Sequence, residues 1–254
     1  MYWSPKGANG TAVTITAPHQ GRLLEDLSAQ MQAGSPFAVA TLNLDHVVKL
    51  RGDVAFREAY LAHSHITADG RPITWLSALA GQPVELVPGS ELIEPLMELC
   101  AKHQVSVAFL GATQETLDAA ADVLVARYPG LKVVAKIAPE MGFDPTGESA
   151  STHVETLRAA GAGLCCLALG APKQERFAAF ALNHGLSMGF VSIGAGLDFI
   201  AGTQVRAPVW VRKIAAEWIW RLAQNPRRLA GRYIACIATL PRLTLRATSL
   251  RGRG

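Results

Sequence analysis

The sequence is poor in cysteine and in aromatic residues, and none of its hydrophobic runs is long enough to span a membrane. Its four cysteines show no CxxC spacing. Cys165 and Cys166 are neighbours in an apolar segment, which favours buried thiols in a reducing compartment over a zinc site or disulfides. Asp-X-Asp triplets and histidine clusters are also missing, so we expect no metal site. Because the first residues lack the basic start and apolar stretch of a signal peptide, we expect a cytoplasmic protein.

Acidic residues are nearly absent from the last part of the chain. Residues 204–254 contain eleven Lys and Arg but one acid, Glu217, a balance of +10. Residues 1–203 carry thirteen basic and nineteen acidic residues, a balance of −6. A segment this basic indicates an anionic partner, which could be membrane lipid, nucleic acid or a phosphorylated substrate.

Apolar residues, in contrast, make up half of the 254 residues, and they alternate between strand and helix patterns. This alternation, with strands apolar on both sides, predicts an α/β fold over residues 1–203: a mostly parallel sheet with helices on both faces. The predicted strands are 11–16 (weak), 37–42, 65–68, 84–87, 105–110, 131–137, 164–169 and 188–193. The predicted helices are 21–32, 54–63, 72–80, 90–103 with Ser90 as its cap, 114–127, 152–160 and 174–184.

The pattern changes in the basic segment, and we predict a helical appendage over residues 204–254. Apolar residues at helical spacing predict an amphipathic helix over 208–224. Asn225 and Pro226 are typical of an N-terminal cap and a first helical residue, so a second helix should start there, and Pro241 should break it.

A dense group of polar residues follows the strand predicted at 164–169. Lys173, Gln174, Glu175 and Arg176 come directly after Gly170-Ala-Pro172, at the start of a helix. In open parallel sheets, ligands bind at the carboxyl ends of strands. We expect Gln174 to contact a substrate and Lys173 to be available to a phosphate.

Two further strand ends carry polar residues. Asp69 follows the strand at 65–68 and could either take a proton from a substrate hydroxyl or cap the next helix. Polar residues alternate with leucines at Thr41, Asn43 and Asp45, which predicts that these three side chains lie on one side of the chain. The alternative is that they cap a helix or form a turn. For Asp45 and His46 we favour such a local structural role.

Glycines and one acid at strand-to-helix junctions are candidates for nucleotide binding. Gly111 and Gly170 permit close approach of a phosphate to backbone N–H groups. Neither belongs to a GxGxxG or Walker motif, so their evidence is weak. Asp198 follows a run of small residues and could face a ribose or a base edge, or cap a helix.

The arginines of the appendage are candidates for binding a diphosphate, because guanidinium groups pair bidentately with phosphate oxygens. The alternative is a solvated basic face or attraction to lipid. Tryptophans at 210, 218 and 220 accompany the arginines, and such side chains suit a membrane interface. The candidates are Arg206, Arg212, Arg221, Arg228 and Arg232.

Taken together, these segments resemble the WecG/TagA/CpsF family of bacterial glycosyltransferases, glycosyltransferase family twenty-six. The resemblance covers roughly residues 35–235, in the family's order. The matching segments are Thr41-Leu-Asn43, Ala68-Asp69-Gly70, Val87-Pro-Gly-Ser90, Phe109-Leu-Gly111, Tyr128-Pro129, Leu169-Gly-Ala-Pro-Lys-Gln-Glu175, Gly194-Ala-Gly-Leu-Asp-Phe199, Arg206-Ala-Pro208, Trp218-Ile-Trp-Arg221, Asn225-Pro-Arg-Arg228 and Arg232-Tyr233.

The resemblance implies a Rossmann-like core and an inverting transfer in cell-surface or exopolysaccharide biosynthesis. The donor would be a UDP-sugar, and the acceptor a sugar on polyprenyl diphosphate at the cytoplasmic face of the membrane. Asp69 matches the family's proposed base, Thr41, Asn43 and Gln174 match pocket residues, and the tail arginines match an appendage over the diphosphate. The segment 136–143 resembles the xanthan-type branch, which adds glucose. The donor is therefore open between glucose and an N-acetylhexosamine such as N-acetylmannosamine.

Two other functions fit parts of the sequence. A non-catalytic module could bind a nucleotide or nucleic acid through the same basic tail, but tryptophans on amphipathic helices favour a membrane, and we expect no nucleic-acid partner. A dinucleotide-dependent oxidoreductase is disfavoured because GxGxxG is missing. Whether the chain forms a homo-oligomer stays open.

Overall fold

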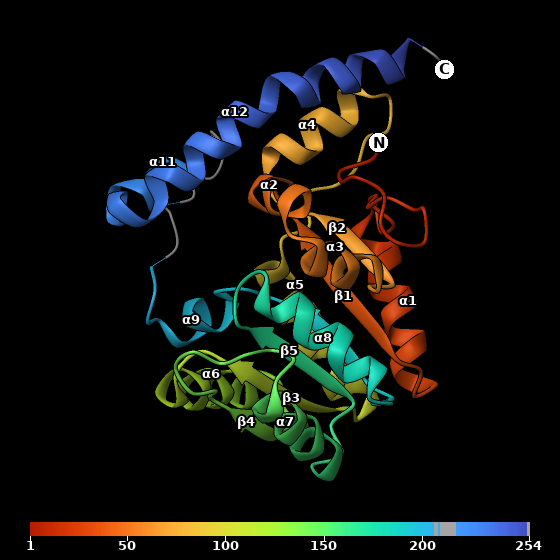
Figure 1. Ribbon diagram of the computed structural model, residues 1–254. Coiled ribbons are helices and arrows are strands. Elements are labelled where there is room, and N and C mark those ends of the chain that lie inside the picture. Colours follow the sequence, from red (N-terminus) through yellow and green to blue (C-terminus); the bar gives the residue numbers. More distant parts are fainter. Residues whose placement is uncertain (206–207, 209–216, 253–254) are drawn as a thin grey trace.

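The computed structural model describes residues 1–205, 208 and 217–252, and it contains one parallel sheet surrounded by helices (Figure 1). Every pair of neighbouring strands is parallel, in the order β2-β1-β6-β5-β3-β4. The predicted parallel α/β fold is therefore confirmed. The strands are β1 (Phe37–Leu42), β2 (His65–Ala68), β3 (Ser106–Gly111), β4 (Lys132–Ile137), β5 (Leu164–Ala168) and β6 (Gly189–Ser192).

Helices cover both faces of the sheet. On one face α1, α5, α6 and α9 pack on the strands, and on the other α3, α7 and α8 do so. Their bounds are α1 (Gln20–Gln32), α2 (Leu44–Gly52), α3 (Val54–Leu61), α4 (Arg71–Leu79), α5 (Gly89–His103), α6 (Gln114–Arg127), α7 (Glu148–Ala159), α8 (Lys173–Asn183), α9 (Gly196–Ala201), α11 (Glu217–Gln224) and α12 (Pro226–Arg251).

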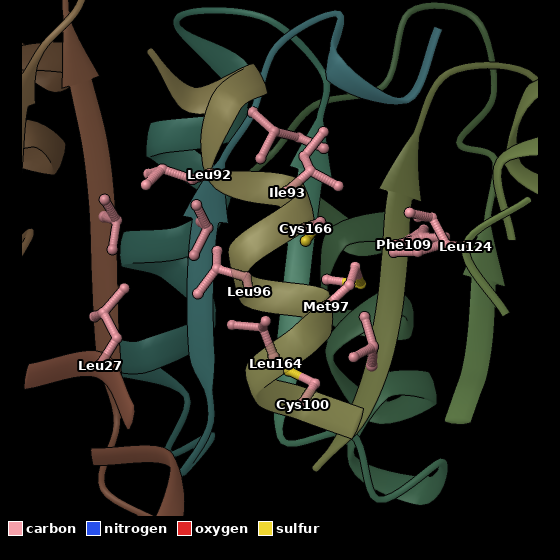
Figure 2. Close-up of a cluster of buried hydrophobic side chains, with 14 of the residues drawn as sticks. Leu27, Leu92, Ile93, Leu96, Met97, Cys100, Phe109, Leu124, Leu164 and Cys166 are labelled. Atoms are coloured by element: carbon pink, nitrogen blue, oxygen red, sulfur yellow. The ribbon is translucent and has the colours of Figure 1, made fainter. Parts of the chain in front are cut away.

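The core follows from the strand sequences, which are apolar on both sides. In β5 every residue from Leu164 to Leu167 is fully buried, with successive side chains entering opposite faces. Figure 2 shows α5 lying across the strands, with Leu96 and Met97 directed toward Leu164 and Cys166. Each such fully buried side chain contributes roughly 1.5–3 kcal/mol to stability. All four cysteines are buried and free, as predicted.

Two predicted strands are absent, and two helices, α2 and α9, were not predicted. Residues 11–16 and 84–87 form only isolated bridges, between Lys6 and Ala12 and between Ala68 and Leu86. Helix α2 (Leu44–Gly52) occupies a stretch where polar residues alternating with leucines imitated a strand. Ser90 does not cap α5, because Pro88 holds the cap position and no side chain bonds there.

Helix α12 continues through Pro241, so the predicted break there is wrong. Pro241 lacks an N–H and weakens the helix locally. Buried residues spaced three or four apart lie on both sides of it: Cys236 and Thr239 before, Leu243 and Ala247 after. Packing of this seam against α2 and α4 compensates for the lost hydrogen bond. None of the helices described has both the length and the hydropathy that a membrane span requires.

The connections between strands change direction between β5 and β3. The chain leaves β3 outward to β4, whereas it leaves the neighbouring β5 inward to β6, so the two connections diverge. Diverging connections leave a gap at the carboxyl ends of parallel strands. The polar segments that follow β1, β2, β5 and β6 all lie at this carboxyl edge.

Candidate active site

Asp69 lies at the carboxyl end of β2, beside the end of β1. Its backbone N–H donates to the carbonyl of Leu42 over 2.7 Å, which ties the two strand ends together. Gly70 follows with φ +99°, a conformation that glycine adopts readily, and it occupies the cap position of α4. Asp69 therefore does not hold the cap position that was its alternative role.

Thr41 and Asn43 lie at the end of β1, but they do not share a face with Asp45. Thr41 is buried in the strand, in register with Thr67 of β2. The side-chain oxygen of Asn43 accepts the N–H of His46 over 3.0 Å, so Asn43 caps α2. The chain turns into a helix after Asn43, so the expectation that all three line one side is wrong.

His46 and Tyr60 form a buried polar pair under the strand ends. The Nδ1 atom of His46 lies 3.1 Å from the Tyr60 hydroxyl, and both rings pack edge to face with Phe56. Burial, together with the charge of Lys49, lowers the pKa of His46 to about 3. His46 is therefore neutral at physiological pH, in line with the structural role favoured for it.

Gln174 and Glu175 are both buried at the start of α8, with exposed fractions of 3% and 0%. The Gln174 amide oxygen accepts the N–H of Gly194 over 3.2 Å, and its nitrogen donates to Glu175 Oε1 over 2.9 Å. These two bonds fix the orientation of the amide. They also connect the segment after β5 to the segment after β6.

The Glu175 carboxyl group is the most perturbed acid of this region. Burial raises its pKa to about 7, against the opposing influence of the Gln174 hydrogen bond and of Lys49. Its Oε2 atom is buried, and within the described chain it has no hydrogen-bond partner. A buried carboxyl group without a full set of partners is costly when charged. Glu175 therefore changes its charge near neutral pH.

Tyr60 places the two acids in one site. Burial raises the pKa of its hydroxyl well above the usual value, and the carboxylates of Glu175 and then Asp69 raise it further. Both carboxylates therefore act electrostatically on the same buried ring. The helices that carry Tyr60 and Glu175, α3 and α8, pack together. Residues after β1, β2, β5 and β6 thus meet in one polar centre.

The predicted nucleotide-binding residues have clear structural roles. A Cβ on Gly111 would lie 2.5 Å from the backbone of Ala168, so only glycine lets β3 and β5 approach here. Gly170 has φ +70° with open space around its Cα, so its conformation alone requires glycine. Asp198 lies in the first turn of α9 and accepts from the Thr203 hydroxyl over 3.3 Å. It does not cap α9, since Ala195 holds that position.

Of the predicted cations, Lys173 and Arg232 are described by the structure. Lys173 begins α8. Hydrogen bonds are the main cause of the lowered pKa values of Glu140 and Asp144, between β4 and α7, and the charge of Lys173 lowers both slightly further. Arg232 of α12 lies beside the site: its Nε is 3.1 Å from Asp45, which also pairs with Lys49 at 2.7 Å. Arg206 and Arg212 lie outside the described residues, as do the side chains of Arg221 and Arg228.

Three residues of this centre were not predicted: Lys49, Tyr60 and Glu175. Glu175 had a detectable signal, because it lies on the same helical face as Ala178 and Ala179, where a charged residue is unusual. Lys49 and Tyr60 had none, since each reaches the site only through the packing of α2 and α3. No group of three His, Cys, Asp or Glu that could hold a metal ion occurs in the part of the chain described.

The arrangement can perform proton transfer at a buried polar centre. Asp69 supplies a carboxylate at a strand end, Gln174 a fixed amide, and Glu175 a carboxyl group that titrates near neutrality. Lys49 and Arg232 add positive charge on the α2 side. These are the elements that a transfer between a hydroxyl nucleophile and an anionic leaving group requires.

Comparisons with known proteins point to one enzyme class. The family model described as Glycosyl transferase WecG/TagA/CpsF family matches residues 9–253. Two relatives, from Staphylococcus aureus strains MW2 and NCTC 8325, are each 28% identical over 199 residues. The matched segment covers 78% of this chain and 76% of each relative. Both are called N-acetylglucosaminyldiphosphoundecaprenol N-acetyl-beta-D-mannosaminyltransferase.

Proposed function

This chain belongs to the WecG/TagA/CpsF family of glycosyltransferases, and from this membership we infer that it moves a hexose or N-acetylhexosamine from a UDP-sugar to a polyprenyl-diphosphate-linked sugar. The observation that carries the proposal is the family match over residues 9–253. The names of the two staphylococcal relatives support it, because they specify a sugar on diphosphoundecaprenol as acceptor. The placement of Asp69, Gln174 and Glu175 around one centre gives the proposal its chemistry.

We propose that Asp69 is the general base of a direct displacement. Its carboxylate takes the proton from the acceptor hydroxyl as that oxygen bonds to the anomeric carbon of the donor. The bond between this carbon and the UDP oxygen breaks at the same time, and UDP leaves from the opposite face with the electron pair. The anomeric configuration is therefore inverted.

The proposed substrate contacts are hydrogen-bonding groups at the strand ends. In its two hydrogen bonds the Gln174 amide uses one of two N–H donors and one of two oxygen lone pairs, so one of each remains for a sugar. Thr41 and Asn43 complete this wall of the proposed pocket. Gly111, Gly170 and Asp198 are the proposed nucleotide contacts.

Positive charge must stabilise the departing diphosphate, because fixed charges of this kind usually give the largest catalytic term. We propose that Lys173 and five arginines of the tail supply this charge, namely Arg206, Arg212, Arg221, Arg228 and Arg232. Arg232 supports this because α12 already brings it to the α2 side of the site. Residues 204–254 would thus act as an appendage to the catalytic body of residues 1–203, at the cytoplasmic membrane surface.

The donor sugar is proposed to be N-acetylmannosamine, as in the names of the relatives, with glucose as the alternative from the xanthan-type resemblance. The test supplies UDP-N-acetylmannosamine, UDP-glucose and UDP-N-acetylglucosamine in turn, with undecaprenyl-diphospho-N-acetylglucosamine as acceptor. We expect release of UDP and a glycosylated lipid with the first donor. Product from UDP-glucose alone would reassign the donor, and absence of product with all three would contradict the proposed reaction.

A further inference from the structure

A cavity lies between the N-terminal segment and α12, and none of the proposed catalytic residues lines it. Figure 1 shows that the N-terminus lies near the α4 and α12 helices. The volume of the cavity is about 820 Å³, within the range of small-molecule binding sites. Its wall includes Lys6 from the N-terminal segment, Arg51 from the end of α2, and Arg242 and Arg246 from α12. Because Arg51 lies eight residues after the cap of α2, the helical rise places it roughly 12 Å from the catalytic end of that helix.

Within the described residues, the four cations of this cavity have no ion pair with an acid. None of the lining residues is Asp or Glu, and no ion pair in the described part of the chain includes any of the four. Several basic side chains elsewhere are paired with acids, as Arg127 is with Glu94 and Lys136 with Asp118. An unpaired group of like charges therefore sets this cavity apart.

The arginines of the cavity lie close enough to repel one another. Burial lowers the pKa of Arg51, and the charges of Arg242 and Arg246 lower it further. Arg246 also lies over the ring of Tyr2, 5.7 Å from its centre, a cation–π contact that holds it in place. Repulsion between fixed guanidinium groups destabilises the empty cavity, and an anion bound between them would relieve it.

We propose that this cavity binds a phosphate group, held by the guanidinium groups of Arg51, Arg242 and Arg246. Guanidinium groups match phosphate oxygens bidentately, and three arginines line this cavity. Trp3 and Leu243, both almost fully buried, supply an apolar wall beside the cations. The cavity therefore suits a ligand that carries a phosphate group next to an apolar group.

This inference goes beyond the proposed glycosyl transfer, because no residue of the cavity belongs to the proposed catalytic or substrate-binding set. Two sources could supply the phosphate: the headgroup of an anionic phospholipid, or a free phosphate compound. The first would fix the N-terminal segment and α12 on a membrane surface. The second would make the cavity a site for a soluble effector.

The experiment compares the full chain with Arg51→Gln/Arg246→Gln and with a control that loses the same charge elsewhere, Lys102→Gln/Lys132→Gln. Lys102 and Lys132 are exposed, and neither lines the cavity. Binding is measured to phosphatidylcholine vesicles with and without phosphatidylglycerol, and by calorimetry to inorganic pyrophosphate. Thermal unfolding checks that each variant is folded. If the double variant is not folded, Arg246→Gln alone replaces it.

We expect the Arg51→Gln/Arg246→Gln variant to lose roughly 25-fold in affinity, about five-fold per charge, while the control stays near the wild type. Loss confined to phosphatidylglycerol vesicles supports the headgroup, and loss confined to pyrophosphate supports the soluble compound. Unchanged binding in both assays, or equal losses in the control, would overturn the proposal. The Arg51→Gln/Arg246→Gln variant should transfer sugar to a water-soluble acceptor analogue as fast as the wild type. This assay distinguishes failure of the phosphate site from failure of the proposed reaction.

Discussion

The two ends of helix α2 lie in opposite electrostatic surroundings. At its start, Asp45 pairs with Lys49 and with Arg232 of α12, close to the acids of the catalytic centre. At its end, Arg51 meets Arg242 of the same α12, with no acid among the cavity residues. Helices α2 and α12 thus form two charge clusters: a balanced cluster of acids and bases at the start of α2, and an unbalanced cluster of bases alone at its end. The balanced cluster suits controlled proton transfer, and the unbalanced one suits anion binding.

The largest expected effect tests whether the balanced end is the catalytic one. If Asp69 is the base, Asp69→Asn should lower turnover by about a hundredfold or more, because the amide cannot accept the proton. Turnover is measured as UDP release with lipid acceptor. Asp118→Asn is the matched control, since Asp118 is an exposed acid paired with Lys136 on the far edge of the sheet. Near-normal turnover of a folded Asp69→Asn enzyme would show that Asp69 is not the general base.

The second effect concerns the pH dependence of stability at the catalytic centre. Glu175 has a folded pKa of about 7, above the usual value of 4.5, so the folded protein retains a proton that the unfolded chain releases. Glu175 therefore contributes stability below about pH 4.5, and this contribution is lost as the pH rises through 7. The loss amounts to up to about 3 kcal/mol.

Comparison of the wild type with Glu175→Gln isolates this contribution. Burial lowers the pKa of His46 to about 3 and that of His63 to about 4. These two histidines have the opposite effect on stability, because the folded protein becomes more stable as the pH rises from about 3 to 6.5. They act equally in both proteins. Urea unfolding at pH 5 and pH 7.5 should show the wild type losing stability relative to Glu175→Gln. An equal pH response of the two proteins would show that Glu175 is not protonated in the folded state.

The smallest effect compares two arginines of α12. Arg232→Gln removes an ion pair with the nearly buried Asp45 and should lower the free energy of unfolding by about 1 kcal/mol or less. Arg246→Gln removes a cation that makes no ion pair with any described acid, and it should leave the free energy of unfolding within about 0.5 kcal/mol of the wild type. Both are measured by urea unfolding in low salt. Equal losses in the two variants would mean that the charge environments at the two ends of α2 are alike.

Local sequence patterns determined much of the sheet. The strands at 37–42 and 65–68 and the helix at 114–127 were predicted with the bounds that the structure has. Their signals are local: runs apolar on both sides for the strands, and helical spacing after a Thr113 cap for α6. The position of Asp69 and Gln174 at strand ends follows equally from these patterns, because parallel strands present their carboxyl ends at one edge.

Local patterns failed where packing between distant segments decided the outcome. Alternation with leucines predicted that Thr41, Asn43 and Asp45 share one side of the chain, yet Asn43 caps α2 and the chain continues as a helix that packs on α3. Pro241 would end an isolated helix, but the buried seam on both sides of it preserves α12. In each case long-range apolar contacts outweighed a local preference of about a few kcal/mol.

The sequence by itself determined the fold class, the family and the strand ends that carry polar residues, because each depends on residues close together in the chain. Only the tertiary structure decided which charges meet. Glu175 titrates near neutrality because α3 and α8 bury it beside Tyr60. Arg51 and Arg246 line one cavity because α12 packs along α2. A pKa and a charge cluster depend on distance and desolvation, which residues far apart in the chain acquire only when it folds.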